Sequence, residues 1–278
     1  MDPILLHILT VALYGGLTWH IWRSRWRGPA LAEPVIGLSN TERVWLFASL
    51  LLHGATLTNG IFGGEATPMR FGFSLALSSI MWLAIGLYWV ESHYARMEGL
   101  LILGLPLAAL SVLLPLFWPS QQLLLNADSP IFRGHFLLAM LAYSLFALAA
   151  LHATLMAVAE KQLHRGRLTP FFASLPPLLT MEALLFRIIH IAFVLLTLTL
   201  ASGFLFAETL FGKAWRFDHK TLFALASWLV FAFLIAGRHL RGWRGRTALR
   251  FTLAGFVALL LAYVGSRFVL EVLLGRPA

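Results

Sequence analysis

Long, uninterrupted apolar runs recur along the whole sequence and restrict its fold more than any other feature. Each run is about as long as the 20 residues that an α-helix needs to cross the hydrocarbon core of a bilayer. The runs are continuous rather than alternating, which excludes a membrane β-barrel. They cover residues 4–22, 43–61, 71–91, 99–118, 134–159, 184–206, 219–237 and 251–271. The sequence therefore predicts an all-α, polytopic membrane protein with about eight transmembrane helices.

The remaining sequence adds no second folding unit. The connections between the apolar runs are too short to fold by themselves, so residues 1–278 are expected to form a single integral membrane domain. The first run lacks a basic flank and a small-residue cleavage site, and we expect it to remain as an anchor rather than to be removed as a signal peptide. The chain contains no cysteine. This excludes a disulfide framework, thiolate metal sites and redox chemistry by a protein thiol.

Positive charge is abundant and unevenly placed. The formal net charge is +9, and 14 of the 21 Lys and Arg residues lie after odd-numbered runs. Because cytoplasmic loops of membrane proteins are enriched in Lys and Arg, this pattern indicates membrane topology rather than nucleic-acid binding. It predicts that both termini lie outside, on the periplasmic side. The segment between the sixth and seventh runs would then also lie outside.

Two histidines begin predicted helices at this outer end, and each has basic neighbours. His135 begins the fifth run, and His219 begins the seventh within the segment FGKAWRFDHK. Imidazole is a common axial ligand of haem iron, basic side chains bind haem propionates, and aromatic rings suit the macrocycle. The outer end supplies these chemical types in Arg133, Trp215, Arg216 and Lys220. Trp and Lys are also frequent at membrane interfaces, so an interface belt is the alternative interpretation.

A third histidine, His53, lies about ten residues into the second run, near the middle of the bilayer. A polar group at that depth is a functional candidate by default. The alternative is a hydrogen bond to Thr56 or to a neighbouring helix. Other chemistries have less support, because no zinc-protease, P-loop or dinucleotide motif stands in a suitable context. The spans also contain few acidic residues, which disfavours a transporter coupled to protons or cations.

Two segments resemble motifs of one membrane protein family. FGKAWRFDHKTLFALASWLVFA resembles the tryptophan-rich segment of the cytochrome c assembly family, whose members are haem-handling membrane proteins. GHFLLAMLAYSLFAL resembles a helix of that family and places His135 at the motif histidine. The similarity covers about residues 45–272 and is closest to a short inner-membrane subgroup. The matching positions of the tryptophan-rich segment are Gly212, Trp215, Asp218, Lys220 and Trp228.

The sequence departs from the family pattern in its histidines. The family has a second outer histidine after its last helix, and this sequence has none there, so His219 is the remaining candidate for a second outer ligand. His219 itself replaces a proline of the family segment. His239 lies about one turn beyond the family's histidine at the cytoplasmic end of the following helix.

The resemblance implies a multi-pass protein of the bacterial inner membrane that assists cytochrome c maturation. It would bind or transfer non-covalent haem b at the periplasmic face, as an accessory or transport protein rather than an enzyme. Its partners would be haem, other assembly proteins or apocytochrome c, and the bilayer, but not nucleic acid. Two alternatives remain: a scaffold that kept the fold without haem binding, or a carrier of another amphipathic anion. The expected iron ligands are His135 and His219, and the other expected cofactor-binding residues are Arg133, Trp215, Arg216, Asp218, Lys220, His53 and His239.

Overall fold

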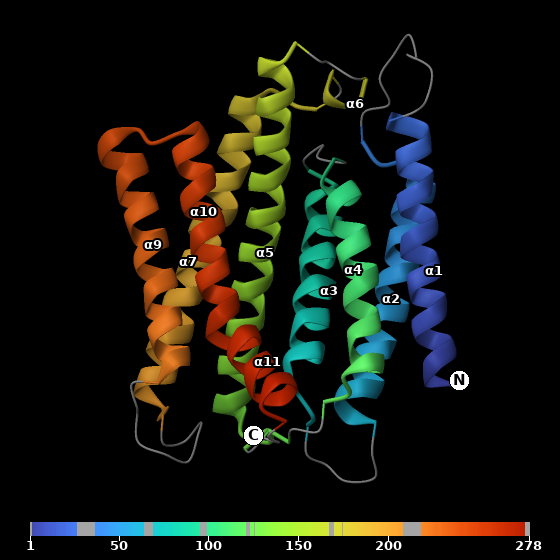
Figure 1. Cartoon of the computed structure of the whole chain (residues 1–278), viewed down its shortest axis with the longest axis vertical. Coiled ribbons are helices and arrows are strands. Elements are labelled where there is room, and N and C mark those ends of the chain that lie inside the picture. Colours follow the sequence, from blue (N-terminus) through green and yellow to red (C-terminus); the bar gives the residue numbers. More distant parts are fainter. Residues whose placement is uncertain are drawn as a thin grey trace.

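The computed structural model of the chain is a bundle of upright helices (Figure 1). It describes residues 2–26, 37–63, 69–94, 99–120, 123–124, 126–166, 170–173, 175–207 and 218–275. Within these residues, eight helical segments are long and apolar enough to cross a membrane, which confirms the predicted all-α, eight-span fold. The two ends of the chain lie at the same end of the bundle, as an even number of spans requires. Which side of the membrane that end faces stays a prediction.

The spans follow the predicted runs in order. They are α1 (Pro3–Ile21), α2 (Asn40–Phe62), α3 (Phe73–Glu91), α4 (Gly99–Phe117), α5 (Pro130–His164), α7 (Leu178–Leu205), α9 (His219–Arg241) and α10 (Gly245–Leu260). The turn η1 (Trp22–Trp26) extends α1, and the short α6 (Pro170–Ala173) precedes α7. The last span continues beyond α10 through η2 (Leu261–Gly265), α11 (Ser266–Phe268) and η3 (Val269–Leu273).

Proline marks the starts of α5 and α7, which both begin earlier than their apolar runs. Pro130 stands in the first turn of α5, and Pro177 immediately precedes α7. Proline suits the first helical turn, where its missing N–H would have no intrahelical partner. The 35 residues of α5 span about 50 Å at 1.5 Å per residue, which exceeds the hydrocarbon core. The last turns of α5 therefore lie beyond the apolar core and carry charged side chains.

Helix α5 joins the two halves of the bundle. It packs on α3 and α4 on one side and on α7 and α10 on the other. Its contact with α9 includes stacked rings of Phe146 and Phe231, whose centroids lie 3.9 Å apart. Gly255 of α10 allows α9 and α10 to approach closely, because a Cβ at this position would lie 2.7 Å from the Phe231 ring of α9. Ser227 of α9 donates a hydrogen bond to the Gly255 carbonyl at 2.9 Å, which is the close helix approach that small residues permit in membranes.

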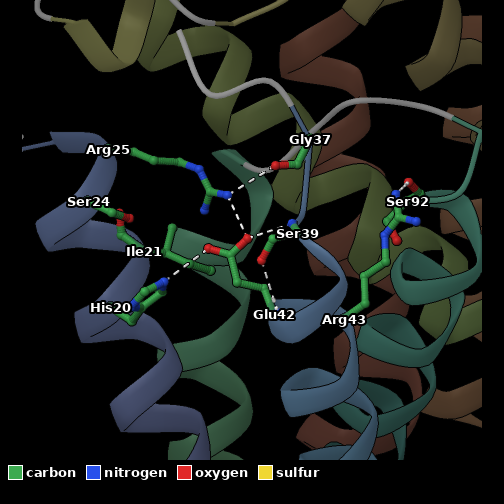
Figure 2. A network of polar contacts seen from close by, with 9 residues as sticks. All are labelled: His20, Ile21, Ser24, Arg25, Gly37, Ser39, Glu42, Arg43 and Ser92. Atoms are coloured by element: carbon green, nitrogen blue, oxygen red, sulfur yellow. Dashed lines mark hydrogen bonds and ion pairs between the residues drawn. The ribbon is translucent and has the colours of Figure 1, made fainter. Parts of the chain in front are cut away.

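A buried ion pair fastens the end of α1 to the start of α2 (Figure 2). The Arg25 Nη2 atom donates to Glu42 Oε2 at 2.9 Å and to the Gly37 carbonyl at 3.1 Å. Glu42 also accepts from the Ser39 backbone N–H, and the Ser39 hydroxyl accepts from the Glu42 N–H in return. This reciprocal cap satisfies two of the N–H groups that a helix start leaves unpaired. The His20 Nε2 atom lies 3.3 Å from Glu42 Oε1.

A second buried carboxylate ties three helices of the other half together. Glu182 of α7 accepts from Arg238 Nη1 of α9, and it accepts from the Gly245 backbone N–H at the start of α10 at 3.1 Å. The Arg238 guanidinium also lies 4.6 Å from the centroid of the Phe186 ring. Breaking a buried pair of this kind costs about 3–5 kcal/mol, because one charge is left uncompensated. Some of the cations that the sequence assigns to topology therefore also hold helices together.

Candidate functional site

His135 lies in the first turns of α5, at the end of the bundle that contains both chain ends. Its Nδ1 atom lies 2.8 Å from the Ser202 hydroxyl of α7. That hydroxyl also lies 3.0 Å from the Thr199 carbonyl. When it donates its one hydrogen to that carbonyl, it accepts from His135 Nδ1–H, and the imidazole then carries its lone pair on Nε2. This is the tautomer that metal-binding histidines use, with the other nitrogen held by a hydrogen bond.

The last turn of α7 brings the chain close to this ring. A Cβ added to Gly203 would lie 3.3 Å from His135 Cε1, so a larger residue there would press on the imidazole. Helix α7 ends at Leu205 and leads directly into the aromatic segment. Trp215 and Arg216 of that segment lie outside the described residues. His135 is thus positioned by the helix turn that precedes the tryptophan-rich segment.

The start of α9 places three predicted site residues side by side. Asp218 caps the helix, because its Oδ1 accepts from the Thr221 N–H at 2.9 Å and from the Thr221 hydroxyl at 3.0 Å. His219 is exposed in the first turn, and Lys220 is half-buried beside it. Asp218 therefore fixes the junction between the aromatic segment and α9, which sets the directions of the two residues that follow.

One of the cations at this end of the bundle, Arg267, is buried. Arg267 of α11 is only 8% exposed, and it lies 5.7 Å from the centroid of the Tyr263 ring. Its charge opposes that of Lys220, which Asp218 in turn favours, and Glu271 in the next helical turn partly balances Arg267. The sequence identifies Arg267 only as one outer cation. Its burial depends on how α11 packs, which no local pattern reveals.

Arg133 makes local contacts in the structure. Its Nε donates to the Ala127 carbonyl at 3.0 Å, and its Nη2 donates to Asp128 Oδ1 at 3.2 Å. Both members of this ion pair are largely exposed, so the pair contributes little to stability. A ligand carboxylate near the start of α5 would compete with Asp128 for this guanidinium.

His53 lies in the other half of the bundle and is fully buried. Its Nδ1 atom is 3.1 Å from the Tyr14 hydroxyl of α1, and its Nε2 atom is 2.9 Å from the Ser78 hydroxyl of α3. The sequence suggested Thr56 as a hydrogen-bond partner of the His53 ring. The Thr56 hydroxyl instead donates to the backbone carbonyl of His53. Both ring nitrogens thus have protein partners. Iron ligation by His53 would require the loss of one of these bonds.

His239 lies near the opposite end of α9, where a second imidazole faces it. The ring of His190 on α7 is 5.6 Å away between centroids, with an angle of 32° between the ring planes. His190 Nδ1–H donates to the Phe186 carbonyl at 2.6 Å, which again leaves the lone pair on Nε2. The sequence contains no signal for this pair, because the two residues stand on different helices.

The described residues contain no group of three or more His, Asp or Glu residues that could enclose a metal ion. Haem needs only one or two axial ligands from the protein, because the porphyrin supplies the other four. The His135 tautomer and the basic side chains of α9 and α11 fit that requirement.

Comparison with known proteins agrees with the membrane fold. The family profile described as "Cytochrome C assembly protein" matches residues 38–274. The chain is 30% identical to "Inner membrane protein YpjD" of Escherichia coli (strain K12) over 252 residues, which cover 89% of each chain. It is 38% identical over 89 residues to "Cytochrome c biogenesis protein CcsA" of Prochlorococcus marinus (strain MIT 9515), covering 32% of this chain and 28% of that protein. No solved structure shows significant similarity to the chain.

The family match covers most of the chain, and the relative that aligns along nearly all of it is named as an inner-membrane protein. The eight spans make the chain a multi-pass protein of that membrane. The role that the family description gives is in cytochrome c assembly. The chain belongs to the cytochrome c assembly protein family.

Proposed function

We propose that this protein handles haem during cytochrome c maturation, by binding or passing non-covalent haem at the periplasmic end of the bundle. The observation that carries the proposal is the state of His135. Its hydrogen bond to Ser202 orients the ring and leaves the lone pair on Nε2, as an axial iron ligand requires.

The other residues at this end would bind the rest of the haem molecule. Lys220 and Arg267 supply positive charge for the propionates, and Asp218 caps α9 so that Lys220 keeps its place. His219, in the first turn of α9, is the candidate second axial ligand. Trp215 and Arg216 are proposed to contact the macrocycle and a propionate, as the family resemblance implies.

The chain would act as an accessory or transport protein. Bound haem would supply the prosthetic group for a cytochrome, and the thioether bonds would form on cysteines of the apocytochrome, because this chain has none. His239, opposite His190 at the other end of α9, is proposed as a further haem contact on the cytoplasmic side. The chain's own residues would bind, orient and release haem.

Absorbance spectroscopy tests the proposal directly. The full chain is expressed with added haem and purified, and the Soret absorbance is measured for each unit of folded protein. His135→Ala should lower the Soret absorbance, and added imidazole should partly restore it by filling the vacated position. His164→Ala is the matched control, because His164 is exposed at the other end of α5.

Two results would count against this function. Equal spectra for the two variants would exclude His135 as a ligand. A parent protein without haem, even after supplementation, would favour a scaffold that kept the family fold and lost haem binding. If the parent does bind haem, a comparison of its spectrum with that of His219→Ala separates a single axial ligand from a pair.

A further inference from the structure

An open groove of about 480 Å³ lies between the last turns of α5 and the first turns of α10. It is at the end of the bundle opposite His135, so it is separate from the proposed haem site. Four exposed cations line its mouth: Lys161, Arg165, Arg246 and Arg250. Lys161 and Arg165 stand four residues apart at the end of α5, and Arg246 and Arg250 stand four residues apart in the first turns of α10. Like charges at this spacing on a helix repel each other.

The groove contains too little negative charge to balance these cations. Its one carboxylate, Glu160, accepts from Arg246 Nε at 2.9 Å. Among the described residues, Lys161, Arg165 and Arg250 form no ion pair with an acidic side chain. Four cations against one carboxylate produce a positive potential in a concave surface, where low-dielectric walls concentrate the field. The groove is therefore suited to an anion.

Part of the groove lining is apolar. Ala157, Leu249 and Leu253 supply it, and Ala157 and Leu253 lie about one helical turn nearer the middle of their helices than Lys161 and Arg250. Leu253 is seven residues beyond Arg246, which corresponds to about 10 Å along a helix. The lining thus changes from basic to apolar over about the depth of a phospholipid headgroup with its first acyl methylenes. A free phosphate would use the mouth alone and leave the apolar part of the lining without a ligand.

We propose that this groove binds an anionic phospholipid. The phosphate would lie among Lys161, Arg165 and Arg250, and the glycerol and upper acyl chain would lie along Leu249 and Leu253. Basic residues at a membrane surface attract anionic lipids, and a cleft between helices converts that attraction into a defined site. The bound lipid would also neutralise the like-charge pairs on α5 and α10. The proposal does not depend on haem binding.

Lipid retention by the purified full chain tests the site. The protein is placed in nanodiscs that contain equal amounts of phosphatidylglycerol and phosphatidylcholine, and the lipids that stay bound on release are counted by native mass spectrometry. The parent should retain phosphatidylglycerol in preference to phosphatidylcholine. The double variant Lys161→Gln/Arg250→Gln should lower that preference about tenfold or more, given the attraction of each basic residue to anionic lipid.

The matched control removes the same charge from the same end of the bundle. Arg23→Gln/Arg241→Gln changes two exposed cations that do not line the groove, and it should retain phosphatidylglycerol like the parent. Equal losses in the two double variants would show only diffuse surface charge and would overturn the proposal. Equal retention of the two lipids by the parent would overturn it as well.

Two further arms test the apolar part of the lining and the source of the phosphate. Ala157→Phe fills that apolar part and keeps every charge, so it should also lower phosphatidylglycerol retention. Soluble glycerol phosphate is added to the parent in detergent, and thermal unfolding is measured. If glycerol phosphate raises the melting temperature as much as phosphatidylglycerol does, the groove is an anion site without a lipid chain, and the lipid assignment is wrong.

Discussion

His53 and His135 lie in different halves of one bundle, and their ring nitrogens are used in different ways. His53 is completely buried between Tyr14 and Ser78, and each of its nitrogens meets a protein hydroxyl. His135 is half-buried near the start of α5, and its Nδ1 lies 2.8 Å from the Ser202 hydroxyl of α7. An intramembrane histidine is a functional candidate by default, and the hydrogen bonds of His53 to two other helices give it a role in joining them.

The charged groups of the two halves of the bundle also differ in their surroundings. Around Glu42, a carboxylate, a guanidinium and a helix start satisfy one another within the protein (Figure 2). Near Lys220 and Arg267, two cations interact with two carboxylates, Asp218 and Glu271. The first region stabilises the fold, and the second is the proposed contact for the haem propionates.

The largest expected effect is in reporter fusions that test membrane orientation, because each reporter lies either in the cytoplasm or in the periplasm. Fusions after residues 27, 167 and 246 should report the cytoplasm, and fusions after residues 64, 125 and 278 should report the periplasm. The expectation follows from the excess of Lys and Arg beside the first set. A cytoplasmic report from residue 278 would place His135 on the wrong side for periplasmic haem handling.

Replacing His53 should mainly affect stability. In His53→Ala, the Tyr14 and Ser78 hydroxyls lose their partner and a cavity opens between α1, α2 and α3, which should lower the free energy of unfolding by about 3 kcal/mol. Thermal unfolding in detergent measures the loss, with His164→Ala as the exposed control. The Soret absorbance for each unit of folded protein should stay at the parent value. A lower Soret absorbance with unchanged thermal unfolding would show that His53 takes part in haem binding rather than in stabilising the fold.

Removing the hydroxyl beside His135 should weaken haem binding without greatly changing stability. Ser202→Ala deletes the acceptor that orients the imidazole, and losing such a partner typically lowers metal affinity about tenfold or more. A haem titration of the purified variant measures the change. Ser266→Ala is the control, because that hydroxyl bonds only to carbonyls of its own helix. An unchanged affinity in Ser202→Ala would show that other contacts orient the ring.

The charge of Lys220 should have the smallest effect. Lys220→Ala should lower haem affinity about fivefold or less, because a point charge near water contributes about 1 kcal/mol or less. The difference from the parent should shrink at high salt, since exposed charges are screened. Lys161→Ala, at the opposite end of the bundle, provides the comparison. Equal affinities for the two variants would favour an interface belt over a propionate contact.

Local sequence predicted some contacts of the site and could not predict others. The position of His135 at a helix end follows from where its apolar run begins. Its partner Ser202 is 67 residues away and becomes adjacent only because α5 packs on α7. The sequence predicted Arg133 to lie near a propionate. In the structure its guanidinium donates to Asp128 and to the Ala127 carbonyl, which are five and six residues away in the sequence. Trp215 and Arg216 lie outside the described residues, so their predicted roles stay predictions.

The sequence by itself determined the eight spans of this protein, because the thickness of a bilayer and the need to satisfy backbone hydrogen bonds leave an apolar run of 20 residues almost no other structure. It also indicated the family through residues near the ends of two helices. Only the tertiary structure decided which polar residues meet. Tyr14, His53 and Ser78 come from three helices, and their pairing depends on helix rotation and register. Those are set by packing across the whole bundle, so the use of each histidine nitrogen follows from contacts that no stretch of sequence contains.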